Sequence, residues 1–313
     1  MWAYVIRRIL ATIPVLVIVA FVVFSILHFA PGDPAAVIAG DQATPEQIAQ
    51  IRAQLGLDLP FHEQFLRWVG NVLQGDFGTS IFSGRPVTTL FLQRLEPTIA
   101  LTVTTTIVTI LLAVPAGVLA AWRAGTWIDR AVMSLAVLGF SFPVFVIAYI
   151  LIFVFSIQLD LLPIQGYAPI SEGLGPFLAH LVLPSFALGL SFMALIARIT
   201  RASVLEVLSQ DHIRTVKAKG LSARALLFDH ALPNAAVPIL TIVGVGVAIL
   251  LGGVVVTESV FAIPGMGRLV VDAILHRDYP VIQGVLLIFS AVYVFVNLAV
   301  DLLYVVFDPR IRY

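Results

Sequence analysis

Long apolar runs separated by polar segments dominate this chain. A helix needs roughly 20 mostly apolar residues to cross a bilayer. Six runs meet this length, and they cover residues 9–29, 98–121, 131–157, 177–197, 235–256 and 281–306. The prolines and glycines inside them are normal for membrane helices. The pattern therefore predicts an all-α membrane protein with six transmembrane helices.

The composition supports this prediction and excludes several classes of protein. Hydrophobic residues make up 60% of the 313 residues and charged residues only 12%, and the mean hydropathy is +1.03. An ordinary soluble domain is about 45–50% apolar and about 25% charged. A soluble enzyme, a disordered chain and a nucleic-acid-binding protein are therefore excluded. The absence of cysteine also excludes disulfides and thiolate metal sites.

Lysines and arginines set the expected orientation of the helices. With the N-terminus on the inner side, the inner segments contain twice as many lysines and arginines as the outer segments. Cytoplasmic loops carry such an excess. We therefore expect both termini to lie in the cytoplasm.

The first outer loop carries signals for two short amphipathic helices. Thr44, Pro45 and Gln47 have the pattern of a helix cap, a first-turn proline and a capping-box glutamine. A second helix is expected after Pro60, with Gly75 ending it. Because no acid–base group of residues is visible here, we expect the two helices to lie on the outer membrane surface or to cap the bundle.

The inner loop at residues 201–233 is the most informative segment. A helix is expected to continue inward from the fourth span, Gly220 interrupts it, and Ser222 caps a second short helix. The exposed apolar residues of this hairpin are expected to be Leu221, Leu226, Leu227 and Phe228. A capped helix with an apolar face favours docking to a partner. The alternative is a basic loop that lies on anionic lipid head groups.

The outer segment after the fifth span combines turn residues with apolar residues. Irregular backbone at membrane depth is tolerated only inside protein or beside an aqueous cavity. Two interpretations therefore stay open: the segment lines a translocation path, or it is a tight connection between two spans. The candidate path or gate residues are Phe261, Pro264, Gly265, Met266 and Gly267.

Several kinds of chemistry have no motif in this sequence. The two lysines, Lys217 and Lys219, lie outside the Gly-Lys-Ser/Thr context of a phosphate-binding loop. An intramembrane serine protease built on Ser141 and His180 is the remote enzymatic alternative. Ser141 precedes a proline kink, where we expect its hydroxyl to bond back to a helix carbonyl. A channel or secondary transporter would need coupling-ion carboxylates in mid-span, and none is visible.

One part of the inner loop is similar to a known family motif. Residues 214–222, followed by a Leu-Pro pair, resemble the EAA loop of binding-protein-dependent ABC importer permeases. The glycine of that motif falls on Gly220, and its Glu-Ala-Ala positions fall on Arg214, Thr215 and Val216. This departs from the general motif and resembles the peptide and nickel branch. Further segments similar to that branch are residues 30–34, 75–80, 85–87, 261–268, 277–280, 283–284, 297–301 and 308–310.

Together these segments resemble the first, or B-type, permease subunit of dipeptide and oligopeptide importers. The resemblance implies a type I permease fold, with residues 1–97 as the first helix plus a periplasmic loop. Residues 98–313 would form a five-helix core that includes the coupling loop 201–233. The residues implied in ATPase coupling are Arg214, Thr215, Lys217, Ala218, Gly220, Leu221, Ser222 and Leu226.

The resemblance also implies that the chain lies in the bacterial inner membrane, in contact with its lipids, and works with partner proteins. A homologous second permease would complete a heterodimer, two cytoplasmic ABC ATPases would bind ATP and Mg²⁺, and an extracytoplasmic binding protein would deliver the substrate. This chain would bind no cofactor, metal or nucleic acid and would not be an enzyme. Dipeptides or short oligopeptides are the implied substrates, with nickel, glutathione, opines and oligosaccharides as open alternatives.

Overall fold

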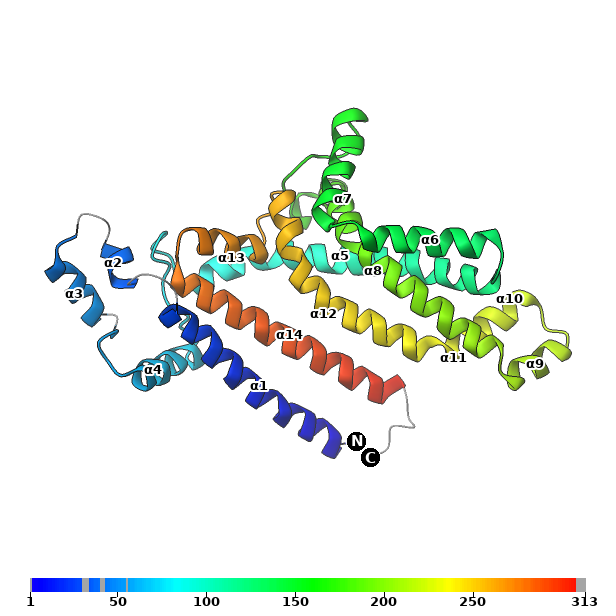
Figure 1. Ribbon diagram of the computed structural model, residues 1–313, viewed down its shortest axis with the longest axis horizontal. Coiled ribbons are helices and arrows are strands. Elements are labelled where there is room, and N and C mark those ends of the chain that lie inside the picture. Colours follow the sequence, from blue (N-terminus) through cyan, green and yellow to red (C-terminus); the bar gives the residue numbers. More distant parts are fainter. Residues whose placement is uncertain (1, 30–33, 40–42, 55, 308–313) are drawn as a thin grey trace. The chain divides into compact units, whose positions relative to one another are not determined.

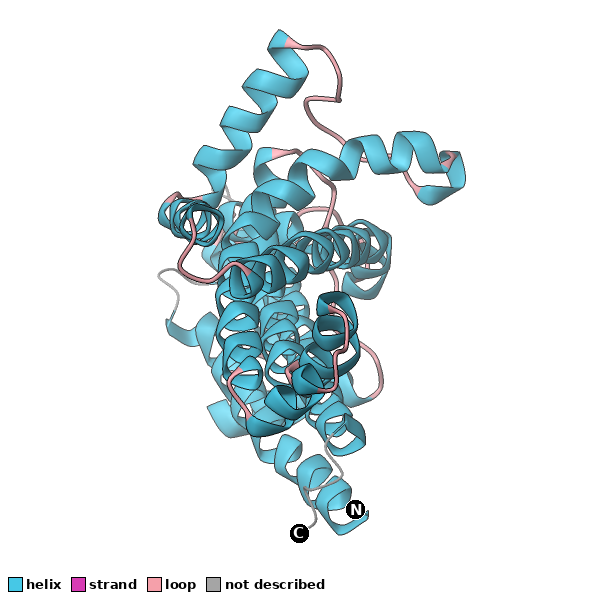
Figure 2. Ribbon diagram, turned by 90° about the vertical axis from the view of Figure 1, so that its right-hand side faces the viewer, coloured by secondary structure: helices cyan, strands magenta, loops and turns pink. Residues whose placement is uncertain are grey.

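The computed structural model describes residues 2–29, 34–39, 43–54 and 56–307. Within these residues the chain is helical, with connecting loops and no β-strand (Figure 2). The prediction of an all-α protein is therefore confirmed. Two of the motif segments, residues 30–33 and 308–310, lie outside the described residues.

The helices follow one another through the whole described chain (Figure 1). Two of the α-helices continue into π-helical turns, at Ile152–Gln158 and Leu226–Ala231, and a 3₁₀ turn lies at Ile170–Glu172. The α-helices are α1 Trp2–Phe29, α2 Pro34–Ala39, α3 Pro45–Gln54, α4 Phe61–Leu73, α5 Val87–Trp122, α6 Trp127–Ser141, α7 Val144–Leu151, α8 Leu174–Leu208, α9 Asp211–Ala218, α10 Ala223–Ala225, α11 Leu232–Asn234, α12 Ala236–Val260, α13 Met266–Leu275 and α14 Tyr279–Phe307.

The described helices include enough apolar length for four to six membrane spans. Four single helices qualify by length and composition, and two bent helix pairs raise the number to six if each pair is one span. The single helices are Ile6–Ile26, Val87–Trp122, Leu174–Leu208 and Tyr279–Leu298. The bent pairs are Trp127–Ser141 with Val144–Gln158, and Ala223–Asn234 with Ala236–Val247. Each of the six predicted spans therefore has a helical counterpart.

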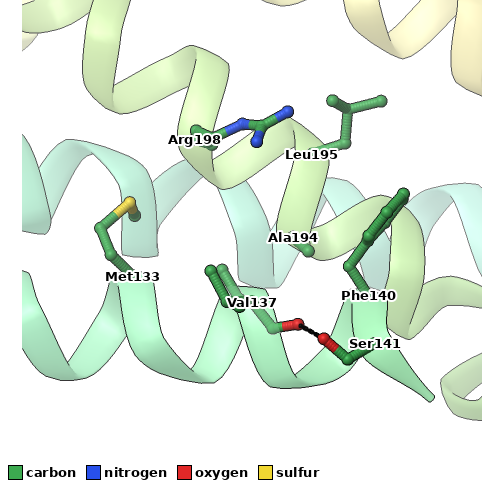
Figure 3. Close-up of a pocket in the computed structure, with 8 residues that line it drawn as sticks. Met133, Val137, Phe140, Ser141, Ala194, Leu195 and Arg198 are labelled. Atoms are coloured by element: carbon green, nitrogen blue, oxygen red, sulfur yellow. Dashed lines mark hydrogen bonds between the residues drawn. The ribbon is translucent and has the colours of Figure 1, made fainter.

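The third predicted span, residues 131–157, is not one continuous helix, which corrects the sequence-based expectation. Helix α6 ends at Ser141 and α7 begins at Val144, with a bend of 105° between the two halves. Phe142 is extended because proline disfavours the α conformation in the residue before it. The Ser141 hydroxyl donates to the Val137 carbonyl oxygen at 2.8 Å, as predicted for a serine beside this break (Figure 3).

The chain divides into two compact units, each with its own apolar core. The first unit contains Pro97–Pro264 and the chain from Ala299, and the second contains Trp2–Glu96 and Gly265–Leu298. This grouping rests on spatial contacts, so it does not test the proposed division of the sequence at residue 97.

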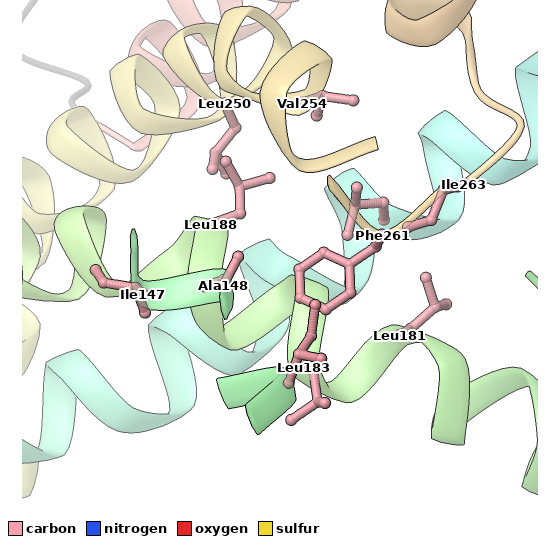
Figure 4. Close-up of a cluster of buried hydrophobic side chains, with 12 residues drawn as sticks. Ile147, Ala148, Leu181, Leu183, Leu188, Leu250, Val254, Phe261 and Ile263 are labelled. Carbon is pink, nitrogen blue, oxygen red and sulfur yellow. The ribbon is translucent and has the colours of Figure 1, made fainter. Parts of the chain in front are cut away.

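In the first unit, α8 is the central element and packs against α6, α7 and α12. Leu181 and Leu188 of α8 lie in a buried cluster with Leu250 and Val254 of α12 (Figure 4). Helix α5 also approaches α8 closely, because a β-carbon on Gly117 would lie 2.6 Å from the Ala197 carbonyl oxygen. Small residues allow membrane helices to pack at this distance.

In the second unit, two short helices, α3 and α4, lie where the sequence predicts them, and their amphipathic character stays a prediction. The Thr44 backbone N–H donates to Gln47 Oε1 at 2.9 Å, and the Gln47 N–H donates to Thr44 Oγ1 at 3.4 Å, which is the predicted capping box. Aromatic rings join α4 to α1: Phe24 contacts Phe65 and Trp68 with centroid distances of 5.4 and 5.5 Å. The Phe24–Phe65 pair is edge-to-face, an arrangement that adds to the free energy of apolar burial.

Candidate functional site

The predicted hairpin follows α8 directly. Helix α8 runs to Leu208, a short turn leads into α9, and α9 ends at Ala218 (Figure 1). Gly220 has φ +78°, a left-handed conformation that is costly for residues with a β-carbon. The Ala225 N–H then donates to Ser222 Oγ at 3.3 Å, so Ser222 is the predicted N-cap of α10. The helix–glycine–helix geometry is therefore confirmed.

The hairpin packs on the core of its own unit. Leu226 is 5% exposed, and Leu227 is also buried. Their buried cluster joins the hairpin to α5 and α8, and its members include Val118, Val204, Val207, Ile213, Leu226, Leu227 and Ala231. The expectation that Leu226 and Leu227 are exposed docking residues is therefore wrong. Their apolar side chains hold the hairpin against α5 and α8 of the bundle.

The opposite face of the hairpin is open. Phe228 is 52% exposed and Leu221 is also exposed, as predicted. A surface hollow of about 470 Å³ is lined by Ser222, Arg224, Ala225, Phe228 and Asp229. The remaining coupling candidates Arg214, Thr215, Lys217, Ala218 and Ser222 are exposed on the same hairpin. Exposed apolar side chains beside charged ones are typical of a surface that binds a protein partner.

The candidate gate segment lies mostly inside the protein. Phe261 is 2% exposed and belongs to the buried cluster of Figure 4, together with Leu181 and Leu183. Its carbonyl oxygen accepts a hydrogen bond from the Gly166 N–H at 2.8 Å. These contacts favour the tight connection at Phe261.

The rest of the candidate gate spans the start of α13. Gly265, Met266 and Gly267 are buried, whereas Pro264 is half-buried. Ala262 has φ +52°, a left-handed conformation that is uncommon for a residue with a β-carbon. A role in lining a path stays a prediction for these residues.

Sequence reasoning missed a buried carboxylate next to this segment. Glu258 is fully buried at 0% exposure, and the Thr98 hydroxyl donates to its Oε1 at 2.5 Å. The Glu258 carbonyl oxygen also accepts from the Ile263 N–H at 2.9 Å, which closes the turn after α12. The sequence did contain a signal for this site, because Glu258 is an acidic residue inside an otherwise apolar helix. No local sequence pattern predicts the hydrogen bond to Thr98, because Thr98 and Glu258 are far apart in the sequence.

An ion pair close to the hairpin was also missed. Arg201 of α8 donates to both carboxylate oxygens of Asp129 in α6, at 2.5 and 2.7 Å. The Gly125 N–H donates to the same carboxylate at 2.9 Å. This bidentate pair fixes the start of α6 against the part of α8 that leads into the hairpin.

In the second unit, Asp278 connects two segments that the sequence separates widely. Its buried carboxylate accepts from the Ser80 hydroxyl at 2.5 Å and from the Ile81 N–H at 3.1 Å. Phe82 and His276 stack beside this point, with ring centroids 4.3 Å apart. Asp278 therefore anchors the segment before α5 to the start of α14.

Replacing Asp278 with alanine should release this segment. Hydrogen bonds to a charged group contribute about 1.5–3 kcal/mol each, and Ser80 would lose its buried partner. We expect the Ile81 amide to exchange its hydrogen about 30-fold faster, which corresponds to about 2 kcal/mol. Hydrogen–deuterium exchange with mass spectrometry measures this. The control is Asp272→Ala, because Asp272 is a more exposed carboxylate on α13. Equal exchange in both variants would contradict the anchoring role.

The serine and histidine of the protease alternative are each bonded to their own helix. The Ser141 hydroxyl is bonded to Val137, and His180 Nδ1 lies 2.8 Å from the Pro176 carbonyl oxygen. The groove that Ser141 lines is formed by apolar residues and Arg198, without a histidine or carboxylate among its described lining. The geometry therefore offers Ser141 no general base.

Taken with the multiple spans, the capped hairpin defines a helical membrane protein with a structured, partly apolar surface beyond its long helices. Two protein-family models match the chain. The chain belongs to the family of binding-protein-dependent transport system inner membrane components, whose main model matches residues 113–313 and whose N-terminal model matches residues 1–102.

Individual relatives place the chain more closely. It is 54% identical, over the whole of both chains, to a probable peptide ABC transporter permease protein of Sinorhizobium fredii. It is 46% identical, over 99% of each chain, to the glutathione transport system permease protein GsiC of Salmonella typhi. The inward-facing MetNI methionine ABC transporter matches in fold, with a TM-score of 0.59 at 17% identity over 70% of this chain and 96% of that one.

Family membership establishes the general role of the chain. It is a multi-pass permease subunit of the inner membrane with the type I ABC permease fold. It forms part of the transport path and is not an enzyme. Permeases of this family work with ATPase subunits and a substrate-binding protein.

Proposed function

We propose that this chain is the first permease subunit of an ATP-driven importer for dipeptides or short oligopeptides. The name of the relative from Sinorhizobium fredii, which matches over its full length, supports a peptide substrate. Glutathione is the second candidate, because the GsiC permeases also match over almost the full length. Glutathione is itself a short peptide, so both candidates belong to one chemical class.

The proposed coupling between the ATPases and this permease rests on one observation, the open face of the hairpin. Leu221 and Phe228 are exposed beside Arg224, whereas the opposite face is packed on α5 and α8. In this proposal the hairpin and both termini lie in the cytoplasm, and the open face docks on an ATPase subunit. The ATPase subunits hold ATP and Mg²⁺. A short lever that is packed on one layer and docked on another can transmit a small shift between them.

The proposal includes a particular assembly. A homologous second permease forms a heterodimer with this chain, two ATPases receive the two hairpins, and a binding protein delivers substrate to the outer segments. Affinity purification of the tagged chain from native membranes, followed by mass spectrometry, tests this assembly. Recovery of the second permease, the ATPases and the binding protein supports it. Repeated recovery of this chain alone would contradict it.

The substrate is tested with the purified assembly in liposomes. Labelled dipeptides, tripeptides, glutathione and nickel are offered in turn, each with the cognate binding protein and with internal ATP. We expect ATP-dependent uptake of short peptides. Uptake of nickel without uptake of any peptide would overturn the proposed substrate class.

Replacing Phe228 with alanine should weaken ATPase docking. Truncation of a well-buried aromatic anchor in an interface costs about 2 kcal/mol or more, which corresponds to about 30-fold in affinity. Binding of the purified ATPase to the permease in nanodiscs measures this. Phe82→Ala is the control, because Phe82 is also exposed but lies in the second unit, on a segment proposed to be extracytoplasmic. Unchanged affinity in Phe228→Ala would contradict docking through this face.

A further inference from the structure

A groove lies between α6 and α8, and its lining contains no residue of the hairpin or of the candidate gate. It has a volume of about 240 Å³ and is lined by Met133, Ala136, Val137, Phe140, Ser141, Ala194, Leu195 and Arg198 (Figure 3). Val137 and Phe140 are among the most exposed apolar side chains of α6. The lining is therefore apolar except for one cation and one hydroxyl.

The two ends of the groove differ in chemistry. Arg198 and Met133 lie toward one end, and Phe140 and Ser141 lie toward the other (Figure 3). The Ser141 hydroxyl is already bonded to Val137, so this second end offers little polarity. The groove thus has a charged end and an apolar end.

Arg198 differs from the arginine one turn further along α8. Arg201 is paired with Asp129. Among the residues that the structure describes, none forms a hydrogen bond or an ion pair with Arg198, whose side chain is exposed. The groove lining also contains no carboxylate. The charge of Arg198 is therefore available to an anion from outside this chain.

The groove lies on helices that qualify as membrane spans, so either lipid or another membrane helix covers it. Helix pairs in membranes favour small residues, which let the backbones approach closely. The lining includes the small residues Ala136, Ser141 and Ala194, but Met133, Phe140 and Leu195 are bulky and would hold a neighbouring helix away. A flexible acyl chain can fill such a groove. Basic pockets between helices on the cytoplasmic side bind anionic lipid head groups.

We propose that this groove binds one anionic phospholipid. The phosphate pairs with the Arg198 guanidinium, and an acyl chain runs past Val137 toward Phe140. The choice of the inner leaflet rests on the proposed orientation, in which α8 leads into a cytoplasmic hairpin. Because α6 and α8 pack together and Arg201 ties them at the same end, a lipid in the groove would bridge the two helices that precede the hairpin.

The first test measures lipid retention. The chain is purified with its partner subunits into nanodiscs of phosphatidylcholine mixed with phosphatidylglycerol, and retained lipids are quantified by native mass spectrometry. We expect selective retention of phosphatidylglycerol and about fivefold weaker retention in Arg198→Gln, since a basic residue near the surface contributes about a factor of five. Arg198→Lys should keep most of the retention because it keeps the charge.

The matched control is Arg130→Gln. Arg130 is an exposed arginine on α6 that does not line the groove. Its loss changes the net charge equally and should leave retention unchanged. Equal losses in the two glutamine variants, or equal retention of phosphatidylcholine, would overturn the proposal.

The second test asks what covers the groove. The chain has no cysteine, so Val137→Cys introduces a single thiol into this subunit at the rim. A photoreactive phosphatidylglycerol should label peptides 133–141 and 194–198 in the wild-type chain, and Arg198→Gln should reduce this labelling. A crosslink from Cys at this position to a second permease would instead identify a protein interface and overturn the lipid site. Recovery of the ATPases in the same sample tests the proposed function separately.

Discussion

Replacement of Gly220 with valine is expected to separate ATP hydrolysis from transport. The residue has φ +78°, and residues with a β-carbon pay about 1–2 kcal/mol in this left-handed region. No atom of the described residues lies within 4 Å of a β-carbon built at this position, so the variant introduces backbone strain without a clash. The strain would change the angle at which α10 leaves α9. We expect transport to fall about tenfold, the factor that corresponds to 1.4 kcal/mol.

The measurement compares uptake with ATP hydrolysis in the same liposomes. Hydrolysis should persist in the variant, because the ATPases retain their nucleotide sites, while uptake per ATP falls. Gly84→Val is the matched control: Gly84 has φ +66°, no atom of the described residues within 4 Å of its β-carbon position, and a place in the second unit before α5. A Gly220 variant with unchanged uptake would rule out the lever role of the hairpin.

Replacement of Gly117 with valine is expected to prevent normal packing of the first unit. A β-carbon at this position would lie 2.6 Å from the Ala197 carbonyl oxygen and 2.7 Å from Thr200 Cβ, both on α8. The carbonyl belongs to the backbone and cannot rotate away, so the helices must separate. Overpacking typically costs about 1–3 kcal/mol, and we expect the upper end of this range. The melting temperature of the detergent-purified chain should fall by several degrees.

Gly175→Val provides the control for this prediction. Gly175 also lies in a long helix, at the start of α8, but no atom lies within 4 Å of its β-carbon position. Its replacement should change stability by no more than about 0.5 kcal/mol. Gly117→Ala should give an intermediate loss, because it adds only the clashing carbon. Equal melting temperatures for all three variants would show that α5 and α8 do not pack as closely as the structure indicates.

The hairpin shows which structural features neighbouring residues can predict and which they cannot. Its helix, its glycine and its cap all follow from neighbouring residues, and each was predicted correctly at Gly220 and Ser222. The exposure of its leucines was predicted wrongly, because helical spacing does not tell which side of a short helix faces its own bundle. Leu226 and Leu227 lie inward because Val204 and Val207 of α8 and Val118 of α5 form a surface there.

The broken third span shows a second limit. The run from residue 131 to residue 157 is apolar throughout, and hydropathy alone cannot distinguish a straight helix from two helices joined by a bend. Pro143 supplies a local reason for a break, yet the angle of 105° depends on what packs around α7. Helices α8 and α12 both pack against α7, and neither follows it directly in the sequence.

Hydrophobic pattern, charge and motif were enough to establish the class of protein. They predicted helical spans, a capped hairpin and the permease family, because each property is carried by residues that are neighbours in the chain or by a matched set of short segments. Tertiary structure alone decided which polar groups meet. The Thr98 hydroxyl bonds to Glu258, Ser80 to Asp278 and Arg201 to Asp129. These partners lie far apart in the sequence, and each buried carboxylate gains its hydrogen bond only once the segments have packed.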